Sequence, residues 1–346
     1  INTDAFSLLT EIEEVVIPNS VVSIRSSAFY KCINLKKITI GAGVSSISSE
    51  AFLKNTSIES ISVDDGNEKY SSKDGVLFNK NKTKLIMFPC GNSATEYVIP
   101  DGVKTIGANA FKYCTNLKNI KMPDSLKKIE EHAFSNCEKL TDVKLPDGVT
   151  SIGMYAFEKC TSLLDIEIPE SVTVLGGNAF YECSNLNSVT FYNPQTEIEW
   201  FGCTVPDNAV IYGYRGSTAL NFALTFEKEF VLLKNPNKVT AGKCGENLTW
   251  EKDDDGTLYI RGKGKMSFLP DEPTWKDDYR DEITTVIIEE GVTSIVDFAF
   301  ENCINLKSIT IPDSVTKIGP EAFFNCQKLE EITLPSSIKE IKENCF

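Results

Sequence analysis

A phenylalanine recurs every 23 residues over most of this chain, and this spacing limits what the chain can fold into. A single repeat of this length cannot bury its own apolar side chains, so neighbouring repeats must stack and bury them together. The spacing therefore predicts a solenoid. The ring returns in three runs: Phe6, Phe29 and Phe52; Phe111, Phe134, Phe157 and Phe180; Phe300, Phe323 and Phe346.

Each repeat combines three segments. In the first, Leu163, Ile166 and Ile168 precede a proline, and the alternation at its end is typical of a strand with one buried face. The second is a short extended stretch, as at Val149 and Ile152. The third places Phe, Cys and Leu at steps of three residues, which predicts one helical or 3₁₀ turn. The fold class we predict is α/β: a right-handed solenoid superhelix dominated by strands, with short helical or 3₁₀ turns.

Two segments interrupt the period. Residues 64–97 hold two apolar runs around the polar residues 79–83, a pattern that predicts an inserted β-hairpin and accounts for the long step from Phe52 to Phe111. Residues 192–234 keep apolar content without the period, and Ser217 before an apolar run predicts a short helix there. We expect this segment to be a C-terminal cap on the stack.

A second module is expected after this cap. Residues 235–238 predict a linker, and the turn at 253–256 between two apolar runs predicts a hairpin. The predicted domains are a solenoid over residues 1–234 and a second module over 235–346. The second module would have a β-hairpin cap over 242–282 and repeats over 283–346, and we expect these repeats to continue beyond the last phenylalanine.

The repeat unit resembles a known family. Residues 117–191 and 306–346 match, nearly position by position, the pattern Leu-x-x-Ile-x-Ile-Pro-x-Ser-Val-x-x-Ile-Gly-x-x-Ala-Phe-x-x-Cys, and residues 12–63 match it with more substitutions. This pattern is similar to the BspA-like leucine-rich repeats, the 23-residue Treponema pallidum type. The resemblance implies a bacterial protein, secreted or on the cell surface, used in adhesion and in host or matrix binding. It implies no enzymatic activity.

Composition argues against two classes of partner. The formal net charge of −14, with only four arginines, opposes the cationic surface that nucleic-acid binding requires. No segment approaches the roughly 18 consecutive apolar residues of a membrane span, so we expect no membrane insertion. We expect a monomer in the extracellular space or on the cell surface that binds a protein partner.

The sequence singles out no catalytic, cofactor or metal site. His132 is the only histidine, and because its repeat equivalents are Tyr155, Asn178 and Glu321, we interpret it as solvent-facing rather than catalytic. The acidic run 253–255 lacks the alternating ligands of a calcium loop. We therefore predict no enzymatic activity, no cofactor and no metal ion, and a carbohydrate-active or other enzyme is only a third alternative.

Seven of the eleven cysteines occupy one position of the repeat, three residues after the phenylalanine. Leu9 and Asn55 take the same position, which favours a packing role. Parallel stacking points successive Cβ atoms the same way, so we expect reduced core thiols, with disulfides and metal binding as the alternatives. Cys90, Cys203 and Cys244 lie outside this position, and their redox state stays open.

The outward residues of the first strands form the candidate binding face. They are polar and almost free of aromatic side chains, so we expect weak or multivalent contact with an extended partner, a host or matrix protein. The alternative is a spacer that projects another domain from the cell. The most charged part of the face consists of Lys121, Asp142, Lys144, Asp165 and Glu167.

Overall fold

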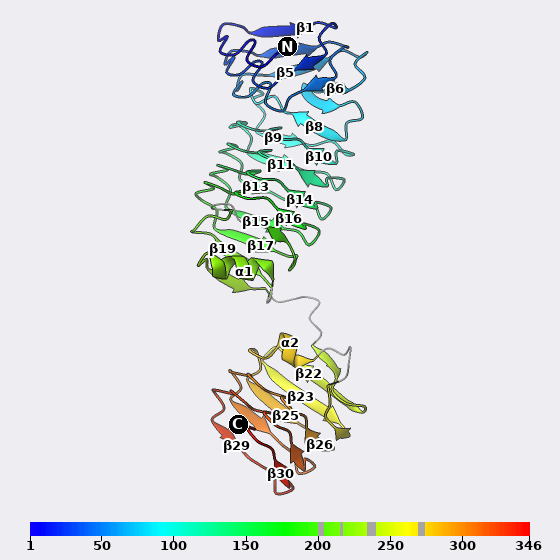
Figure 1. The fold of residues 1–346 in the computed structure, drawn as a ribbon, viewed down its shortest axis with the longest axis vertical. Helices are drawn as coiled ribbons and strands as arrows, with labels where there is room; N and C mark the ends of the chain where they lie inside the picture. Colours follow the sequence, from blue (N-terminus) through cyan, green and yellow to red (C-terminus); the bar gives the residue numbers. More distant parts are fainter. Residues whose placement is uncertain (200–203, 215–216, 234–239, 269–273) are drawn as a thin grey trace. The chain divides into compact units, whose positions relative to one another are not determined.

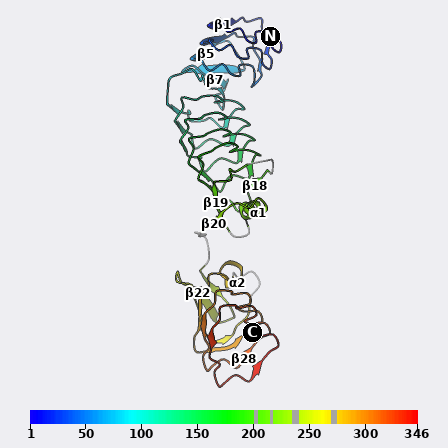
Figure 2. The same cartoon turned by 90° about the vertical axis from the view of Figure 1, so that its left-hand side faces the viewer.

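A computed structural model describes residues 1–199, 204–214, 217–233, 240–268 and 274–346 of the chain. Two compact units make up the chain, Ile1–Leu233 and Lys234–Phe346. Each is built from stacked coils of strands and turns (Figure 1, Figure 2), so the predicted solenoid is confirmed. The linker predicted at 235–238 lies outside the described residues.

The first segment of each repeat is a short strand, and most of these strands pair in parallel with the strand of the next repeat. Partners in the regular repeats are 23 positions apart, as in Lys37 with Ser60 and Asn119 with Asp142. In-register parallel pairing stacks equivalent side chains, so the inward residues form continuous apolar rows. In the first unit these strands are β1 (Glu14–Ile17), β3 (Lys37–Ile40), β5 (Ser60–Val63), β9 (Glu96–Val98), β11 (Asn119–Lys121), β13 (Asp142–Val143), β15 (Asp165–Ile168), β17 (Ser188–Phe191), β19 (Val210–Gly213) and β20 (Phe230–Leu232).

The predicted second extended stretch is confirmed. It is only two residues long, and it pairs in parallel on another side of the coil, as in Thr105 with Lys128. One isoleucine or leucine of each of these strands, such as Ile129, points into the core, and all of them are buried except Ile47, which is partly buried. These strands are β2 (Ser23–Ile24), β4 (Ser46–Ile47), β10 (Thr105–Ile106), β12 (Lys128–Ile129), β14 (Ser151–Ile152), β16 (Val174–Leu175) and β18 (Glu197–Ile198).

The third segment is a series of turns, so the predicted helical or 3₁₀ turn is wrong there. Asn109 and Tyr113 have φ angles of 60° and 69°, and residues in the left-handed region interrupt a right-handed helix. Their N–H groups donate to the next repeat, at Glu131 O (3.1 Å) and Ser135 O (2.9 Å). The intervening Lys112 N–H closes a turn on Asn109 O at 3.1 Å. N–H groups that donate to the next repeat thus alternate with N–H groups that close turns within a repeat, and the coil has a third side with hydrogen bonds between repeats.

The phenylalanine rings stack in the core along the coils. Phe134 is completely buried, and its ring centroid lies 4.9 Å from that of Phe111 and 5.2 Å from that of Phe157. The ring planes are within 13° and 6° of parallel. An interior ring such as Phe134 therefore packs between two others, and its removal would affect three repeats.

The insertion ends earlier than predicted because Phe88 already belongs to this row of rings. Its centroid lies 5.1 Å from that of Phe111, and 111 − 88 = 23. The strand β8 (Lys84–Met87) pairs in parallel with β10, so the repeat geometry has resumed well before residue 97. The prediction missed this ring because Met87 replaces the alanine that precedes the phenylalanine in the regular repeats.

The predicted hairpin is confirmed by the antiparallel pairing of β7 (Val76–Asn79) with β8, and β6 (Tyr70–Lys73) adds a third strand. The side chains of β7 alternate between two apolar cores. Val76 and Phe78 belong to the core that contains Phe88, whereas Leu77 belongs to the core of the first repeats. The hairpin therefore lies between two cores and contributes to both.

A short helix closes the far end of the first unit. The predicted helix is confirmed as α1 (Thr218–Thr225), and the Ser217 hydroxyl caps it by accepting a hydrogen bond from Leu220 N at 3.1 Å. Its buried residues Ala219 and Phe222 join the core of the last coils. The strand β20 pairs in parallel with β19 beside this helix.

The second unit starts with an antiparallel hairpin and continues as parallel coils. β22 pairs antiparallel with β23, and β23 then pairs in parallel with β25, so one strand joins the two geometries. The strands are β21 (Ala241–Lys243), β22 (Leu248–Lys252), β23 (Thr257–Gly262), β24 (Gly264–Lys265), β25 (Thr285–Ile288), β26 (Val292–Ile295), β27 (Ser308–Thr310), β28 (Lys317–Ile318), β29 (Glu331–Ile332) and β30 (Glu340–Ile341).

Trp275, at the start of the short helix α2 (Trp275–Asp278), takes the place of a repeat phenylalanine. Its ring lies 5.8 Å from that of Phe300 at 22°, and its indole Nε1 donates to Ala299 O at 2.8 Å. In a regular repeat the backbone provides this bond, as Phe300 N does to Ala322 O at 2.8 Å. The Trp275 side chain thus supplies both the stacked ring and the hydrogen-bond donor that a regular phenylalanine repeat would supply at this place.

Most cysteines of the repeat position are buried thiols, as predicted. Cys137, Cys160 and Cys183 donate to phenylalanine carbonyl oxygens of earlier repeats at 3.1, 3.3 and 3.0 Å. Asn55 makes the equivalent bond from Nδ2 to Phe29 O at 2.7 Å. Cysteine and asparagine at this position therefore donate to the preceding coil, whereas Leu9, in the first repeat, has no donor group.

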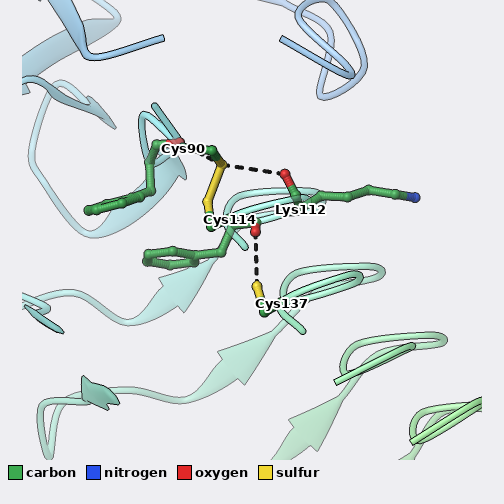
Figure 3. The surroundings of a disulfide bond; sticks show 6 residues. Cys90, Lys112, Cys114 and Cys137 are labelled. Atoms are coloured by element: carbon green, nitrogen blue, oxygen red, sulfur yellow. Dashed lines mark hydrogen bonds between the residues drawn. A yellow bond between two sulfur atoms is a disulfide. The ribbon is translucent and has the colours of Figure 1, made fainter. Parts of the chain in front are cut away.

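Cys114 is the exception, and it corrects the prediction for this position. It forms a disulfide with Cys90, with Cα atoms 4.5 Å apart (Figure 3). Cys90 follows Phe88 by two residues instead of three, so the two cysteines are not equivalent positions of stacked repeats and the argument from parallel Cβ atoms does not apply. Cys244 is a buried thiol, and Cys203 lies outside the described residues.

We expect the thiols of the native protein to react slowly with a thiol reagent. Burial raises the pKa of Cys183 to about 12 and that of Cys326 to about 11, so very little reactive thiolate exists at neutral pH. The measurement is the number of labelled cysteines by intact mass in the native, the denatured, and the denatured and reduced protein. Reduction should add two labels, from Cys90 and Cys114. Fast labelling of most native thiols, or no gain on reduction, would contradict the core assignment or the disulfide respectively.

Candidate functional site

The five candidate residues lie on one face of the first unit, here called the strand face: the outward side of β9, β11, β13, β15 and β17. The alternation of the strands places their neighbours Ile120, Val143 and Ile166 in the core. All five candidate side chains are exposed: Lys121, Asp142, Lys144, Asp165 and Glu167.

A hollow of about 540 Å³ on the strand face is lined by some of these candidate residues and not by the others. It extends over β9, β11 and β13, and Lys121, Asp142 and Lys144 line it. Asp165 and Glu167, on the next strand β15, are not among its lining residues. The structure therefore brings three of the five predicted residues together around one concave surface.

The strand β9 forms a wall of the hollow that was not predicted from the sequence. Glu96, Tyr97 and Val98 line it, but the prediction assigned Glu96 and Tyr97 to the insertion over residues 64–97. Tyr97 packs against Phe88 with ring centroids 4.7 Å apart, and burial, followed by the charge of Asp74, raises the pKa of Tyr97 to about 12. Counting Phe88 as a repeat ring would have aligned Tyr97 with Ile120 and revealed this strand.

The two parts of the face also differ in electrostatics. Within the described part of the chain, Lys121, Asp142 and Lys144 form no ion pair. In contrast, Asp165 accepts a hydrogen bond from Ser188 Oγ at 2.6 Å. Lys121, Asp142 and Lys144 thus keep their charges available, whereas Asp165 is held by the next repeat.

Glu167 is also engaged with its own neighbourhood. Burial raises the pKa of Tyr192, and the charge of Glu167 and a hydrogen bond with it raise that pKa further. Since Tyr192 follows the neighbouring strand β17, Glu167 interacts on the side away from the hollow.

The strand face is interrupted beside the hollow. β9, β11 and β13 form one sheet, and β15, β17, β19 and β20 form another. The break falls between Asp142 and Asp165, where continued pairing would place two carboxylates side by side. The two-residue strands on the other side of the coil remain paired across this break, as in Ser151 with Val174, so the coils stay stacked.

The surroundings of His132 do not form a catalytic triad. His132 is half-buried rather than solvent-facing as predicted, because its ring stacks on that of Tyr155 at 4.9 Å. Burial, and next the positive charge of Lys112, lower the pKa of His132. Ser135 Oγ donates directly to Glu158 at 2.6 Å, whereas a triad needs the histidine between serine and carboxylate.

Among the described residues, no group of three or more His, Cys, Asp and Glu side chains is arranged to hold a metal ion. A separate finding concerns the helices: none within the described ranges is both long and apolar enough to cross a membrane.

The parallel strands, the 23-residue register and the buried Phe and Leu rows place the chain among the leucine-rich repeat proteins. It belongs to the family described as BspA type leucine rich repeat region (6 copies), which matches residues 1–92, 86–200 and 278–346. Comparison with curated proteins gives no match.

Solved bacterial structures are similar to this chain at low sequence identity. A leucine-rich repeat protein from Eubacterium ventriosum is 23% identical, with 94% of this chain and 61% of that chain covered and a TM-score of 0.49. The pneumococcal vaccine antigen PcpA is 22% identical over 65% of this chain and 69% of its own, with a TM-score of 0.50. A leucine rich cell surface protein from Faecalibacterium prausnitzii is 24% identical over 97% and 73%, with a TM-score of 0.30.

Proposed function

We propose that this chain is a non-enzymatic binding protein of the bacterial cell surface or extracellular space, which holds a host or matrix protein on its strand face. The observation that carries the proposal is the hollow of about 540 Å³ lined by Lys121, Asp142 and Lys144, whose charges have no ion-pair partner among the described residues. Leaving such groups unpaired gains nothing for folding, but it suits recognition by an extended partner. The proposed form is a monomer.

The disulfide supports the proposed location. Disulfides persist in oxidising compartments and are rare in the cytosol of most bacteria, and Cys90–Cys114 joins two successive coils near the inserted hairpin. The remaining buried thiols do not oppose this, because inaccessible cysteines are protected from oxidation.

Point substitutions test the face better than deletion of the insertion. β7 contributes to both cores of the first unit, so removing residues 64–97 would disturb the fold as well as the surface. Alanine at three exposed positions changes the charge pattern and leaves both cores intact.

We expect the triple variant Lys121→Ala/Asp142→Ala/Lys144→Ala to bind matrix proteins more weakly, by roughly threefold to a hundredfold, because exposed ion pairs contribute about 0.2–1 kcal/mol each. Collagen, fibronectin and laminin serve as probes in a biolayer assay over a salt series. Binding of the unchanged protein should weaken with salt, since exposed charges are screened beyond about 8 Å at physiological ionic strength.

The matched control is Asp165→Ala/Glu167→Ala on the neighbouring strand, which should change binding less because these groups already have partners. Equal binding by the control, the triple variant and the unchanged protein, on matrix probes and on host cells, would refute recognition by this face. That result would favour a spacer that projects another domain.

A further inference from the structure

Four of the five charged residues that line the hollow lie in two rows of opposite sign, and the fifth, Asp124, follows β11 outside both rows. The register places Glu96, Asn119 and Asp142 side by side at the first outward position of β9, β11 and β13. At the second outward position Lys121 is beside Val98, and Lys144 is the equivalent residue of the following repeat. The first row is therefore acidic and the second is basic.

Within these rows, three charges have no internal partner. Glu96 accepts a hydrogen bond from Asn119 Nδ2 at 2.8 Å, so it is held by the adjacent strand. Asp142, Lys121 and Lys144 form no ion pair within the described ranges. Lys121 lies on β11, and Lys144 directly follows the neighbouring strand β13. Neighbouring strands are about 4.8 Å apart, so the two lysines repel each other.

This arrangement is unusual for a chain with a formal net charge of −14, in which carboxylates outnumber cations. An anionic group from outside would relieve the repulsion between the two lysines. A cationic group would pair with Asp142. A nucleic acid or a phosphate polymer offers only the anionic group, and Asp142 would repel it.

We propose that the hollow selects an extended peptide segment of a protein partner that presents a carboxylate and a cationic side chain two residues apart. This inference rests on the proposed function and specifies the chemistry of the partner. Residues i and i+2 of an extended chain are about 6.6–6.8 Å apart. Asp142 and Lys144 are two residues apart, and the buried Val143 lies between these two exposed side chains. An extended peptide has the same repeat, so its own i and i+2 side chains face both charges.

The shape of the hollow agrees with such a ligand. Its volume of about 540 Å³ is within the usual range of sites for small ligands, so it accommodates a few side chains rather than a folded domain. Val98, 64% exposed on the β9 wall, offers apolar contact beside the charges. Two of the three charged residues lie on β13 or directly after it, at the edge of their sheet.

The test uses the full chain and three blocked hexapeptides with the central sequences Glu-Thr-Lys, Glu-Thr-Glu and Lys-Thr-Lys. Dissociation constants are measured by NMR titration at about 0.15 M salt, where attraction to distant charges is screened. We expect the Glu-Thr-Lys peptide to bind about threefold or more tightly than either other peptide. Asp142→Lys should shift the preference to Glu-Thr-Glu, and Lys121→Glu/Lys144→Glu should shift it to Lys-Thr-Lys.

A matched control carries the same change of charge on the opposite sheet. Lys127 and Lys128 are exposed at β12, so Lys127→Glu/Lys128→Glu should keep the preference of the unchanged protein. Equal affinity for the three peptides, no binding of any of them, or a preference that the reversals at the hollow leave unchanged would overturn the inference.

The outcomes separate this inference from the proposed function. If matrix binding depends on Lys121, Asp142 and Lys144 while the peptides are not discriminated, the strand face binds its partner but the two-charge selection is wrong. If the peptides are discriminated while matrix and cell binding are unaffected by the triple alanine variant, the selection is right and the matrix partner is wrong.

Discussion

Replacing Phe134 by alanine should lower the free energy of unfolding of the first unit by about 3–5 kcal/mol, the usual cost of removing a buried phenyl ring. The ring is fully buried and packs between Phe111 and Phe157 at 4.9 and 5.2 Å. Because each repeat covers only its neighbours, the cavity would weaken the contact between repeats on both sides, and the stack has few other ways to compensate.

The measurement is chemical denaturation of Phe134→Ala beside the surface change Lys144→Ala, with hydrogen exchange to locate the effect. Exchange should accelerate in the coils next to residue 134 before it does so in the second unit. A loss of stability no larger than that of the Lys144→Ala protein would show that the rings do not form the main core of the stack.

Trp275→Ala should destabilise the second unit by about 3–5 kcal/mol, because it removes a fully buried aromatic side chain at the start of the ring stack. Trp275→Phe separates the two roles of this residue. It keeps an aromatic ring against Phe300 but leaves the Ala299 carbonyl without the indole donor, at a cost of about 1–3 kcal/mol for an unsatisfied buried group.

Hydrogen exchange resolved by peptide is suited to this pair, since the first unit of the same molecule is an internal reference. We expect faster exchange in the coils around Phe300 in both variants, more so with alanine, and unchanged exchange around Phe134. If Trp275→Phe were as stable as the unchanged protein, the hydrogen bond to Ala299 would have no structural role.

The sequence predicted which residues of the candidate site are exposed, but not which of their charges remain without a partner. The alternation of β11, β13 and β15 made it certain that Lys121, Asp142 and Asp165 would be exposed once the inward row was known. Which of these charges remain free depends on side chains of other strands. Ser188 and Tyr192 engage Asp165 and Glu167, and no single repeat contains that information.

Several features required the folded chain because the ring position is defined in space rather than by a motif. Phe88 and Trp275 complete the ring stacks although their local sequences differ from the repeat. Cys90 meets Cys114 because the chain resumes its coils directly after the hairpin. In each case the role of the residue follows from its contact with another coil and not from its local sequence.

By itself, the sequence determined that this chain is a solenoid of stacked 23-residue coils, because apolar residues that recur at equivalent inward positions can be buried only by parallel stacking in register. Only the tertiary structure decided that the third side consists of turns. Left-handed residues such as Asn109 and Tyr113 direct their N–H groups to the next coil, and these bonds between repeats replace the bonds that a helix would have made within one repeat.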